Sequence, residues 1–230
     1  MLLERRALNA ELPTIAAMGN VELCELLASL GFPVDGVETK DDQTVLEVDV
    51  TANRGDVLSQ RGMARDIAAK CERELLPIPH RILEEGAPLF PVRLEADACP
   101  VYCTAILELG VSASTPGDVV SFLSSMGSTA KQMPAVDASN ELLHRYGHPT
   151  HAFDADTLNG ALVVRWGRAG ETLRTLDGVD RKLTGEDLVI ADEAVPIALA
   201  GVMGGDATKV TTETKRVLLE SAWFDPRVVR

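Results

Sequence analysis

Three of the chain's four histidines, His144, His148 and His151, lie within eight residues of one another. Imidazole nitrogens bind zinc, and a neutral imidazole also moves protons near neutral pH. A zinc site needs further ligands in tetrahedral order, and the sequence offers no second ligand cluster at a recognisable spacing. We therefore expect no metal here, and the residue types alone favour a solvated polar loop.

Two other stretches carry residue types that occur in ligand sites. Residues 200–205, AGVMGG, place Gly201, Gly204 and Gly205 after an apolar segment. Free glycine N–H groups can line a site for an anion or a carbonyl, although a tight turn explains the same pattern. Glu220 interrupts the apolar stretch LLES. It is either the exposed residue of a half-buried strand or a buried carboxyl that needs a partner or a chemical role.

Composition limits the classes of function. The chain has 230 residues, 46% of them hydrophobic, which is enough for one or two globular domains. Its net charge of −13 argues against a protein that grips nucleic acid unaided, because phosphate binding needs a basic surface. The four cysteines form no C-x-x-C pair, and no apolar run is long enough to span a membrane. We expect reduced cysteines, a cytoplasmic location and no cofactor.

The first third of the chain predicts a small α/β unit. A leucine stripe that begins after Asn20 indicates a helix, and Gly31 occupies the position that follows a helix end. Residues 45–50 alternate as a half-buried strand, and residues 59–71 predict a second helix. Residues 75–91 contain four prolines, so we place a domain boundary in this extended connector.

The remainder predicts helices followed by a sheet, and the whole is therefore an α+β fold with a mainly antiparallel sheet. Residues 99–111 resemble a strand. Thr115 is expected to cap a helix that ends at Gly127. A helix from Ser139 to Arg145 is expected to end at Gly147, which would leave His151 in a loop. Further strands are expected at 161–166, in a hairpin at 175–183, in two segments joined at Asp192 and Glu193, and at 216–224.

Four long stretches share motifs with one protein family. They are LEVDVTANRGDVLSQRGMARDIAA (46–69), GHPTHAFDADTLNG (147–160), LRTLDGVDRKLTGEDLVIADEAVPIALAGVMGG (173–205) and VLLESAWFDPRVVR (217–230). In this order they resemble the β subunit of bacterial phenylalanyl-tRNA synthetase. The resemblance implies a B1-like unit over residues 1–90 and a B3/B4-like tRNA-editing domain over residues 91–230.

The editing domain of this family hydrolyses tyrosine that has been wrongly esterified to tRNA(Phe). Residue by residue, the resemblance places catalytic positions at His151, Gly204 and Glu220, and substrate-binding positions at Asn140, Gly201 and Gly205. Glu220 would accept the phenol hydroxyl of tyrosine, glycine N–H groups would hold the ester carbonyl, and His151 would place a water molecule or bind the terminal ribose. The implied partners are mischarged tRNA, bound weakly by this chain alone, and a synthetase α subunit or an oligomeric partner.

The sequence also departs from the family pattern. It passes directly across the point where the bacterial subunit inserts its tRNA-binding OB module, and it stops before a later segment that completes the editing site. Residues 124–143 differ from the family around Asn140. The modules for ligation are absent, so we expect no ligase activity. The alternative interpretation is therefore a non-catalytic β-subunit fragment or paralogue that acts as a synthetase-associated binding or assembly module.

Overall fold

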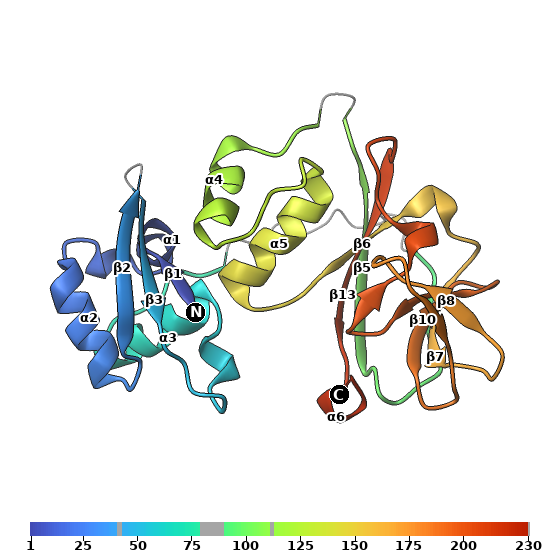
Figure 1. Ribbon diagram of the computed structural model, residues 1–230, viewed down its shortest axis with the longest axis horizontal. Helices are drawn as coiled ribbons and strands as arrows, with labels where there is room; N and C mark the ends of the chain where they lie inside the picture. Colours follow the sequence, from blue (N-terminus) through green and yellow to red (C-terminus); the bar gives the residue numbers. More distant parts are fainter. Residues whose placement is uncertain (41–42, 79–89, 111–112, 230) are drawn as a thin grey trace. The chain divides into compact units, whose positions relative to one another are not determined.

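The computed structural model describes residues 1–40, 43–78, 90–110 and 113–229 (Figure 1). Contacts divide the chain into two units, neither of which is continuous in sequence. The first unit comprises Met1–Ile82, Thr115–Gln132 and Asp137–Pro149, and the second comprises Leu83–Ser114, Met133–Val136 and Thr150–Arg230. The expected boundary at residue 90 adjoins residues 79–89, which lie outside the described residues.

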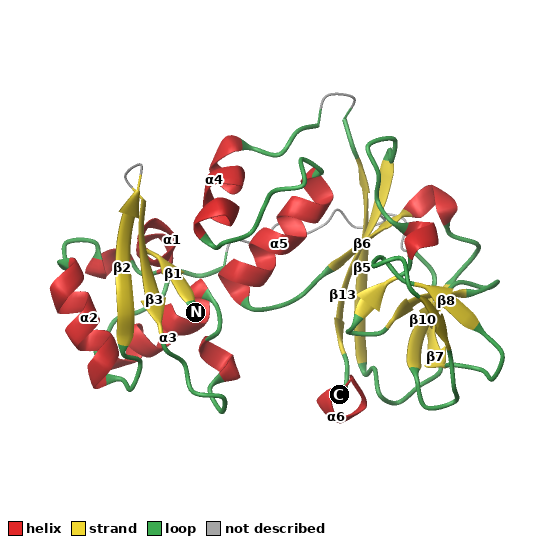
Figure 2. Ribbon diagram, viewed as in Figure 1, coloured by secondary structure: helices red, strands yellow, loops and turns green. Residues whose placement is uncertain are grey.

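The first unit contains a three-stranded antiparallel sheet with helices packed on it (Figure 2). The strand order is β1-β3-β2, from Leu2–Glu4, Gln43–Val48 and Val34–Lys40. Helices α1 (Arg5–Glu11), α2 (Asn20–Ser29) and α3 (Gln60–Lys70) supply leucine, isoleucine and methionine side chains to one core. The expected α2 is confirmed, and Gly31 has the positive φ of +87° that ends such a helix.

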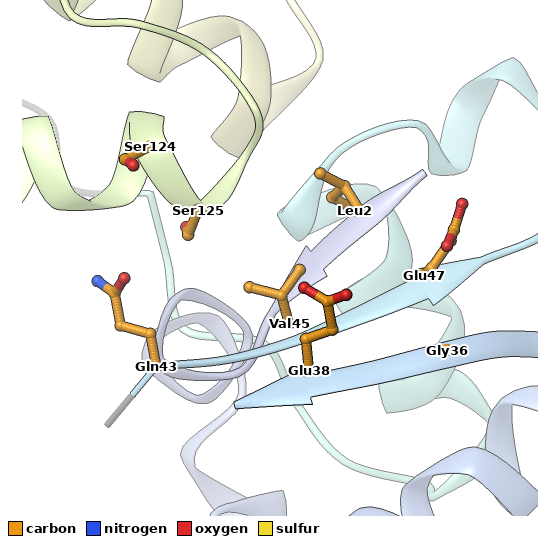
Figure 3. Close-up of a pocket in the computed structure, with 8 residues that line it drawn as sticks. All are labelled: Leu2, Gly36, Glu38, Gln43, Val45, Glu47, Ser124 and Ser125. Carbon is orange, nitrogen blue, oxygen red and sulfur yellow. The ribbon is translucent and has the colours of Figure 1, made fainter. Parts of the chain in front are cut away.

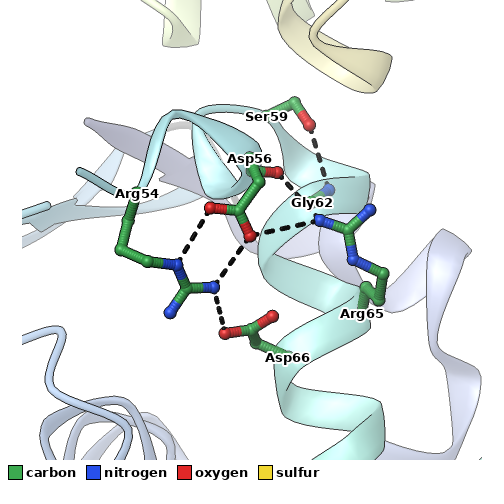
Figure 4. Close-up of polar contacts among 6 residues, drawn as sticks. All are labelled: Arg54, Asp56, Ser59, Gly62, Arg65 and Asp66. Carbon is green, nitrogen blue, oxygen red and sulfur yellow. Dashed lines mark hydrogen bonds and ion pairs between the residues drawn. The ribbon is translucent and has the colours of Figure 1, made fainter. Parts of the chain in front are cut away.

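A polar network holds the loop before α3 against that helix (Figure 4). The Arg54 guanidinium donates to Asp56 at 2.9 Å and to Asp66 at 2.6 Å. Arg54 holds the pKa of Asp56 at about 2, well below its usual value. The Ser59 hydroxyl accepts from the Gly62 N–H at 2.9 Å, so Ser59 caps α3, as the expected start of this helix requires.

Helices α4 (Gly117–Ser125) and α5 (Pro134–Tyr146) depart from the expected starts of these helices. Thr115 does not cap α4, because its hydroxyl donates instead to Asp137 at 2.5 Å. The same carboxylate accepts the Lys131 N–H at 2.7 Å. The expected helix from Ser139 starts at Pro134, since proline favours the first turn of a helix.

The second unit has two main sheets. One is antiparallel, with order β5-β13-β6 from Val101–Glu108, Arg216–Trp223 and His151–Asp154. The other has order β12-β11-β10-β7-β4, from Met203–Gly204, Pro196–Leu199, Leu188–Ala191, Leu162–Trp166 and Val92–Leu94, and only β4 and β7 pair in parallel. Phe153 and Leu218 from the first sheet pack with Leu162 and Ile190 from the second in one core.

The remaining elements of the second unit are short. Strands β8 (Thr172–Arg174) and β9 (Asp180–Lys182) form the expected hairpin, and α6 covers Pro226–Val229. Single 3-10 turns occur in both units, at Pro13–Ile15, Gly55–Val57, Ala155–Thr157 and Asp206–Thr208. The expected α+β class with mainly antiparallel sheets is confirmed.

We predict that Asp137→Ala destabilises the chain by about 2–4 kcal/mol, because the substitution leaves a buried hydroxyl and a backbone N–H without their acceptor. Thr115→Val removes only one of these two hydrogen bonds and should cost about 1 kcal/mol. Urea unfolding of both variants measures the difference. A loss in Asp137→Ala no larger than that in Thr115→Val would contradict the assignment of Asp137 as the shared acceptor.

Candidate functional site

Glu220, on the central strand of the β5-β13-β6 sheet, forms a cross-strand pair with His151 on the edge strand β6. Glu220 on β13 lies directly opposite His151 on β6. Residues paired in this way share one face of an antiparallel sheet, and their Cβ atoms lie about 4.5–5.5 Å apart. The next pair on the same face is Leu218 with Phe153, both of which belong to the core between the two sheets. The two polar side chains therefore extend from an apolar core.

The expectation that His151 lies in a loop is wrong. His151 is the first residue of β6, because its backbone pairs with β13. Its ring also packs edge-on against Phe153, with 4.4 Å between the ring centroids. The imidazole is thus held by a sheet and by an aromatic neighbour, which fixes its position far better than a polar loop would.

Gly204 on β12 packs directly against the His151 ring. A Cβ atom at Gly204 would clash with Cε1 of His151 and would lie 2.7 Å from its Nε2. Any side chain here would displace the imidazole, so glycine is required for the ring to occupy this position. The structure therefore brings together three of the predicted site residues, Gly204, His151 and Glu220.

The backbone N–H of Gly205 is bonded within the sheet, and Gly201 lies in a turn. The Gly205 N–H donates to the Ile197 carbonyl at 2.7 Å, and a Cβ atom at Gly205 would clash with that carbonyl. The Gly205 N–H is therefore already bonded and is not available to a substrate. Gly201 adopts a φ of +69° in the turn after β11, and a Cβ there would crowd Phe224 and Val229.

Burial controls the charge of the central pair. Glu220 is only 6% exposed, and burial raises its pKa to about 7. Burial likewise lowers the pKa of His151 to about 4, so its imidazole is neutral at neutral pH. Glu220 Oε2 and His151 Nε2 are both buried and have no hydrogen-bond partner among the described residues. Unpaired buried polar atoms are costly and rare, so they mark a place where a ligand or a water molecule would bind.

Sequence reasoning missed two further side chains of this site. Tyr102 on β5 lies opposite Ala222, one diagonal step from Glu220 and on the same face. Cys99 precedes β5, and burial followed by the nearby Glu220 raises its pKa to about 11. Side chains that alternate along a strand share one face, so the sequence could have placed Tyr102 on the same face as Thr104 and Ile106. Thr104 is the residue of β5 that pairs with Glu220.

Asn140 and His144 belong to the first unit. Asn140 lies on α5, in the part of that helix that belongs to the first unit, so its role at the site stays a prediction. His144 bonds Ser128 at 3.0 Å and packs against Phe122. Across the described residues, no group of three or more His, Cys, Asp or Glu side chains is arranged to hold a metal ion. Within the same residues, no helix is long and apolar enough to cross a membrane.

A hollow of about 350 Å³ in the first unit carries no comparable chemistry (Figure 3). Its polar lining comes mainly from Glu38 and Glu47 on β2 and β3 and from Ser124 and Ser125 on α4. Both carboxylates are exposed, and none of the unpartnered buried polar atoms of the described chain belongs to this lining. Solvated carboxylates need no ligand, so the strand pair is the better candidate.

The charge of the pair gives a testable pH dependence. In the unfolded chain Glu220 titrates near 4.5 and His151 near 6.5, so between these values the proton sits on His151 when the chain is unfolded and on Glu220 when it is folded. Because folding raises the pKa of Glu220, its ionisation lowers the free energy of unfolding as pH rises from 4.5 to 7. Because folding lowers the pKa of His151, its protonation lowers the free energy of unfolding as pH falls from 6.5 to 4. The two slopes therefore oppose each other in the native chain.

We predict that Glu220→Gln abolishes the decrease in the free energy of unfolding that the ionisation of Glu220 causes between pH 4.5 and pH 7. The free energy of unfolding of this variant, minus that of the native chain, should rise by about 3 kcal/mol from pH 4.5 to pH 7. The matching difference for His151→Gln should fall by a similar amount between pH 4 and pH 6.5. Denaturant titrations across this range measure both. Flat differences would mean that neither group is buried as described.

Comparisons with known proteins agree with the resemblance seen in the sequence motifs. Residues 98–230 match the family model of the B3/4 domain. The phenylalanine–tRNA ligase β subunit of Carboxydothermus hydrogenoformans is 42% identical over 208 residues, which cover 88% of this chain and 26% of that protein. That of Geobacter sulfurreducens is 39% identical over 207 residues, which cover 87% and 26%. The chain thus spans about a quarter of the length of these relatives.

A solved structure supports the fold. An N-terminal fragment of the phenylalanyl-tRNA synthetase β subunit from Pyrococcus horikoshii aligns with 99% of this chain and 69% of its own length, at a TM-score of 0.51 and 17% sequence identity. At this identity the likeness concerns the fold alone. The family match covers all three residues that the sheets bring together, His151, Gly204 and Glu220. The chain therefore belongs to the B3/4 domain family found in phenylalanine–tRNA ligase β subunits.

Proposed function

We propose that this chain is an editing module that hydrolyses the ester bond of mischarged Tyr-tRNA(Phe). The observation that carries the proposal is the pair of buried, unpartnered polar atoms, Glu220 Oε2 and His151 Nε2, on opposite residues of neighbouring strands. Two buried polar atoms without partners are costly, and a ligand that brings a hydroxyl group and a second polar group would satisfy both.

The chemistry of Glu220 suits the discrimination that editing needs. Tyrosine differs from phenylalanine by one hydroxyl, and an apolar synthetic pocket excludes such a small addition poorly. A buried carboxyl that accepts a hydrogen bond from the phenol hydroxyl reverses the selection, because phenylalanine leaves that carboxyl unpaired. Leu218 and Phe153, the next pair on the same face, are fully buried and make the surroundings of Glu220 apolar.

The hydrolytic step needs a positioned water molecule rather than a strong base. Water oxygen attacks the ester carbonyl carbon, the bond from that carbon to the ribose oxygen breaks, and the proton lost by water is taken up by the ribose oxygen. Neutral His151 can hold the water or the terminal ribose through Nε2, and fixed placement of a reactant lowers the barrier. Because the Gly205 N–H is already bonded to Ile197, other donors must polarise the carbonyl.

The negative charge of the chain affects how strongly it can bind tRNA. A net charge of −13 means that affinity for tRNA is weak and falls steeply with salt. A synthetase α subunit or another partner would then supply most of the affinity for tRNA. The same charge favours the second candidate function, a non-catalytic binding or assembly module, and a deacylation assay separates the two.

We predict that the chain deacylates Tyr-tRNA(Phe) and that Glu220→Ala and His151→Ala each lower kcat/KM at least 10-fold, because each removes a polar contact to the substrate or water. Glu213→Ala, which changes an exposed glutamate, is the matched control and should retain full activity. Rates are measured by release of labelled tyrosine at low salt. Turnover no faster than uncatalysed hydrolysis would overturn the proposal in favour of the assembly module.

Gly204→Ala tests the placement of the imidazole. The new methyl group would occupy the space of His151 Cε1, and the ring can move because it is the far end of a side chain. We expect an intact fold, an altered imidazole NMR signal and a loss of kcat of about 10-fold or more. Gly185→Ala, at an exposed glycine where an added Cβ atom meets nothing within 4 Å, is the matched control and should leave both the imidazole signal and the activity unchanged. An unchanged imidazole signal with full activity would contradict the contact.

A further inference from the structure

Tyr102 is a buried polar group that the proposed function leaves unused. It lies on β5 opposite Ala222, which is two residues from Glu220 along β13, and Tyr102 therefore shares a face of the sheet with Glu220. Its hydroxyl oxygen is buried and has no hydrogen-bond partner within the part of the chain that the structure describes. Glu220 Oε2 is in the same condition. Two unpaired polar atoms of adjoining side chains thus face one apolar core.

The Tyr102 hydroxyl lies near enough to the Glu220 carboxyl to interact with it as a hydrogen-bond donor, although the two atoms fall outside full hydrogen-bond geometry. Burial, and after it the nearby Glu220, raises the pKa of Tyr102, so the phenol keeps its proton. The Tyr102 hydroxyl in turn favours the charged form of Glu220 and partly offsets the effect of burial on its pKa. Tyr102 is therefore a donor and ionised Glu220 an acceptor, and each has capacity left for a further group.

A single hydroxyl satisfies both residues at once. A hydroxyl has one proton to donate and two lone pairs to accept with, so it can donate to Glu220 while it accepts from Tyr102. A ligand without that hydroxyl leaves both buried groups unpaired, which costs more than the loss of either hydrogen bond alone. Two-point recognition of this kind is specific for groups that donate and accept through the same atom.

We propose that Tyr102 is a specificity-determining residue of this site, where its hydroxyl donates to the oxygen of a substrate hydroxyl that itself donates to Glu220. The inference rests on the proposed editing function and adds to it a second recognition residue on a third strand element, β5. Tyr102 acts on the choice of substrate, and the ester chemistry remains with the residues described above.

The test compares hydrolysis of Tyr-tRNA(Phe) and Phe-tRNA(Phe) by the native 230-residue chain and by Tyr102→Phe. We expect the ratio of the two kcat/KM values to fall about 10-fold in Tyr102→Phe, through loss of activity on the tyrosyl ester alone. Tyr146→Phe alters the other tyrosine of the chain, which lies on α5, and should leave the ratio unchanged. Thermal unfolding verifies that both variants fold.

The outcomes distinguish the two hypotheses. A native chain that does not prefer the tyrosyl ester overturns the proposed function and this inference together. A native preference that Tyr102→Phe keeps in full overturns the inference alone. A pH profile adds a readout that a purely structural role would not move: loss of the Tyr102 hydroxyl should shift the Glu220 titration to higher pH.

A substrate analogue keeps the inference testable if Tyr102→Phe does not fold. The amine of 4-aminophenylalanine donates to Glu220 but its nitrogen accepts poorly from a phenol. On the native chain, 4-aminophenylalanyl-tRNA(Phe) should therefore be hydrolysed with a kcat/KM between those of the tyrosyl and phenylalanyl esters. A kcat/KM equal to that of the tyrosyl ester would show that the site recognises only the hydrogen bond that the substrate donates to Glu220. It would overturn the proposed role of Tyr102.

Discussion

The register of β13 between β5 and β6 is the constraint on which the site depends. Glu220 pairs with Thr104 on one side and with His151 on the other. Because side chains alternate along a strand, a slip of one residue would move Glu220 to the opposite face of the sheet. Leu218 and Phe153, both fully buried, oppose such a slip because it would bring them out of the core between the sheets. Apolar packing therefore determines where the polar pair lies.

That placement has an energetic cost. A carboxyl and an imidazole in an apolar layer lose their hydration, and the structure gives Glu220 Oε2 and His151 Nε2 no partner among the described residues in return. Elsewhere the chain pairs its buried charges: Asp192 accepts from Asn159, Ala194 and Val195, and Arg165 donates to Glu171. Of the three positions that the family resemblance assigned to catalysis, His151 and Glu220 carry such unpartnered atoms, and Gly204 packs against the His151 ring. Local departures from good pairing are expected where a protein binds a ligand.

Features of the fold that are written in short stretches of sequence could be predicted. Gly31, Gly127 and Gly147 end helices at positive φ, which is a property of one residue type in one local conformation. The strand around Glu220 was predicted from its apolar pattern and is confirmed as β13. Such signals need no knowledge of what the segment packs against.

Features that depend on distant partners could not be predicted in this way. Thr115 has the sequence context of a helix cap, but its hydroxyl donates a hydrogen bond to the Asp137 carboxylate on the following helix instead. His151 follows glycine and proline and was expected in a loop, and only pairing with β13 makes it a strand residue. Family motifs identified His151, Gly204 and Glu220, whereas Tyr102 emerged only when β5 was placed beside β13.

The opposed pKa shifts at the site link its stability to its selectivity. Near pH 7 the folded chain holds neutral His151 beside a Glu220 carboxyl that is partly protonated. A ligand hydroxyl that donates a hydrogen bond binds the ionised carboxylate more strongly than the protonated carboxyl, so its binding should lower the pKa of Glu220 and release a proton. Phenylalanine cannot donate, and it leaves the carboxyl in the protonated form that burial favours. The same desolvation that destabilises the ionised site in the empty chain thus increases the difference between the two substrates.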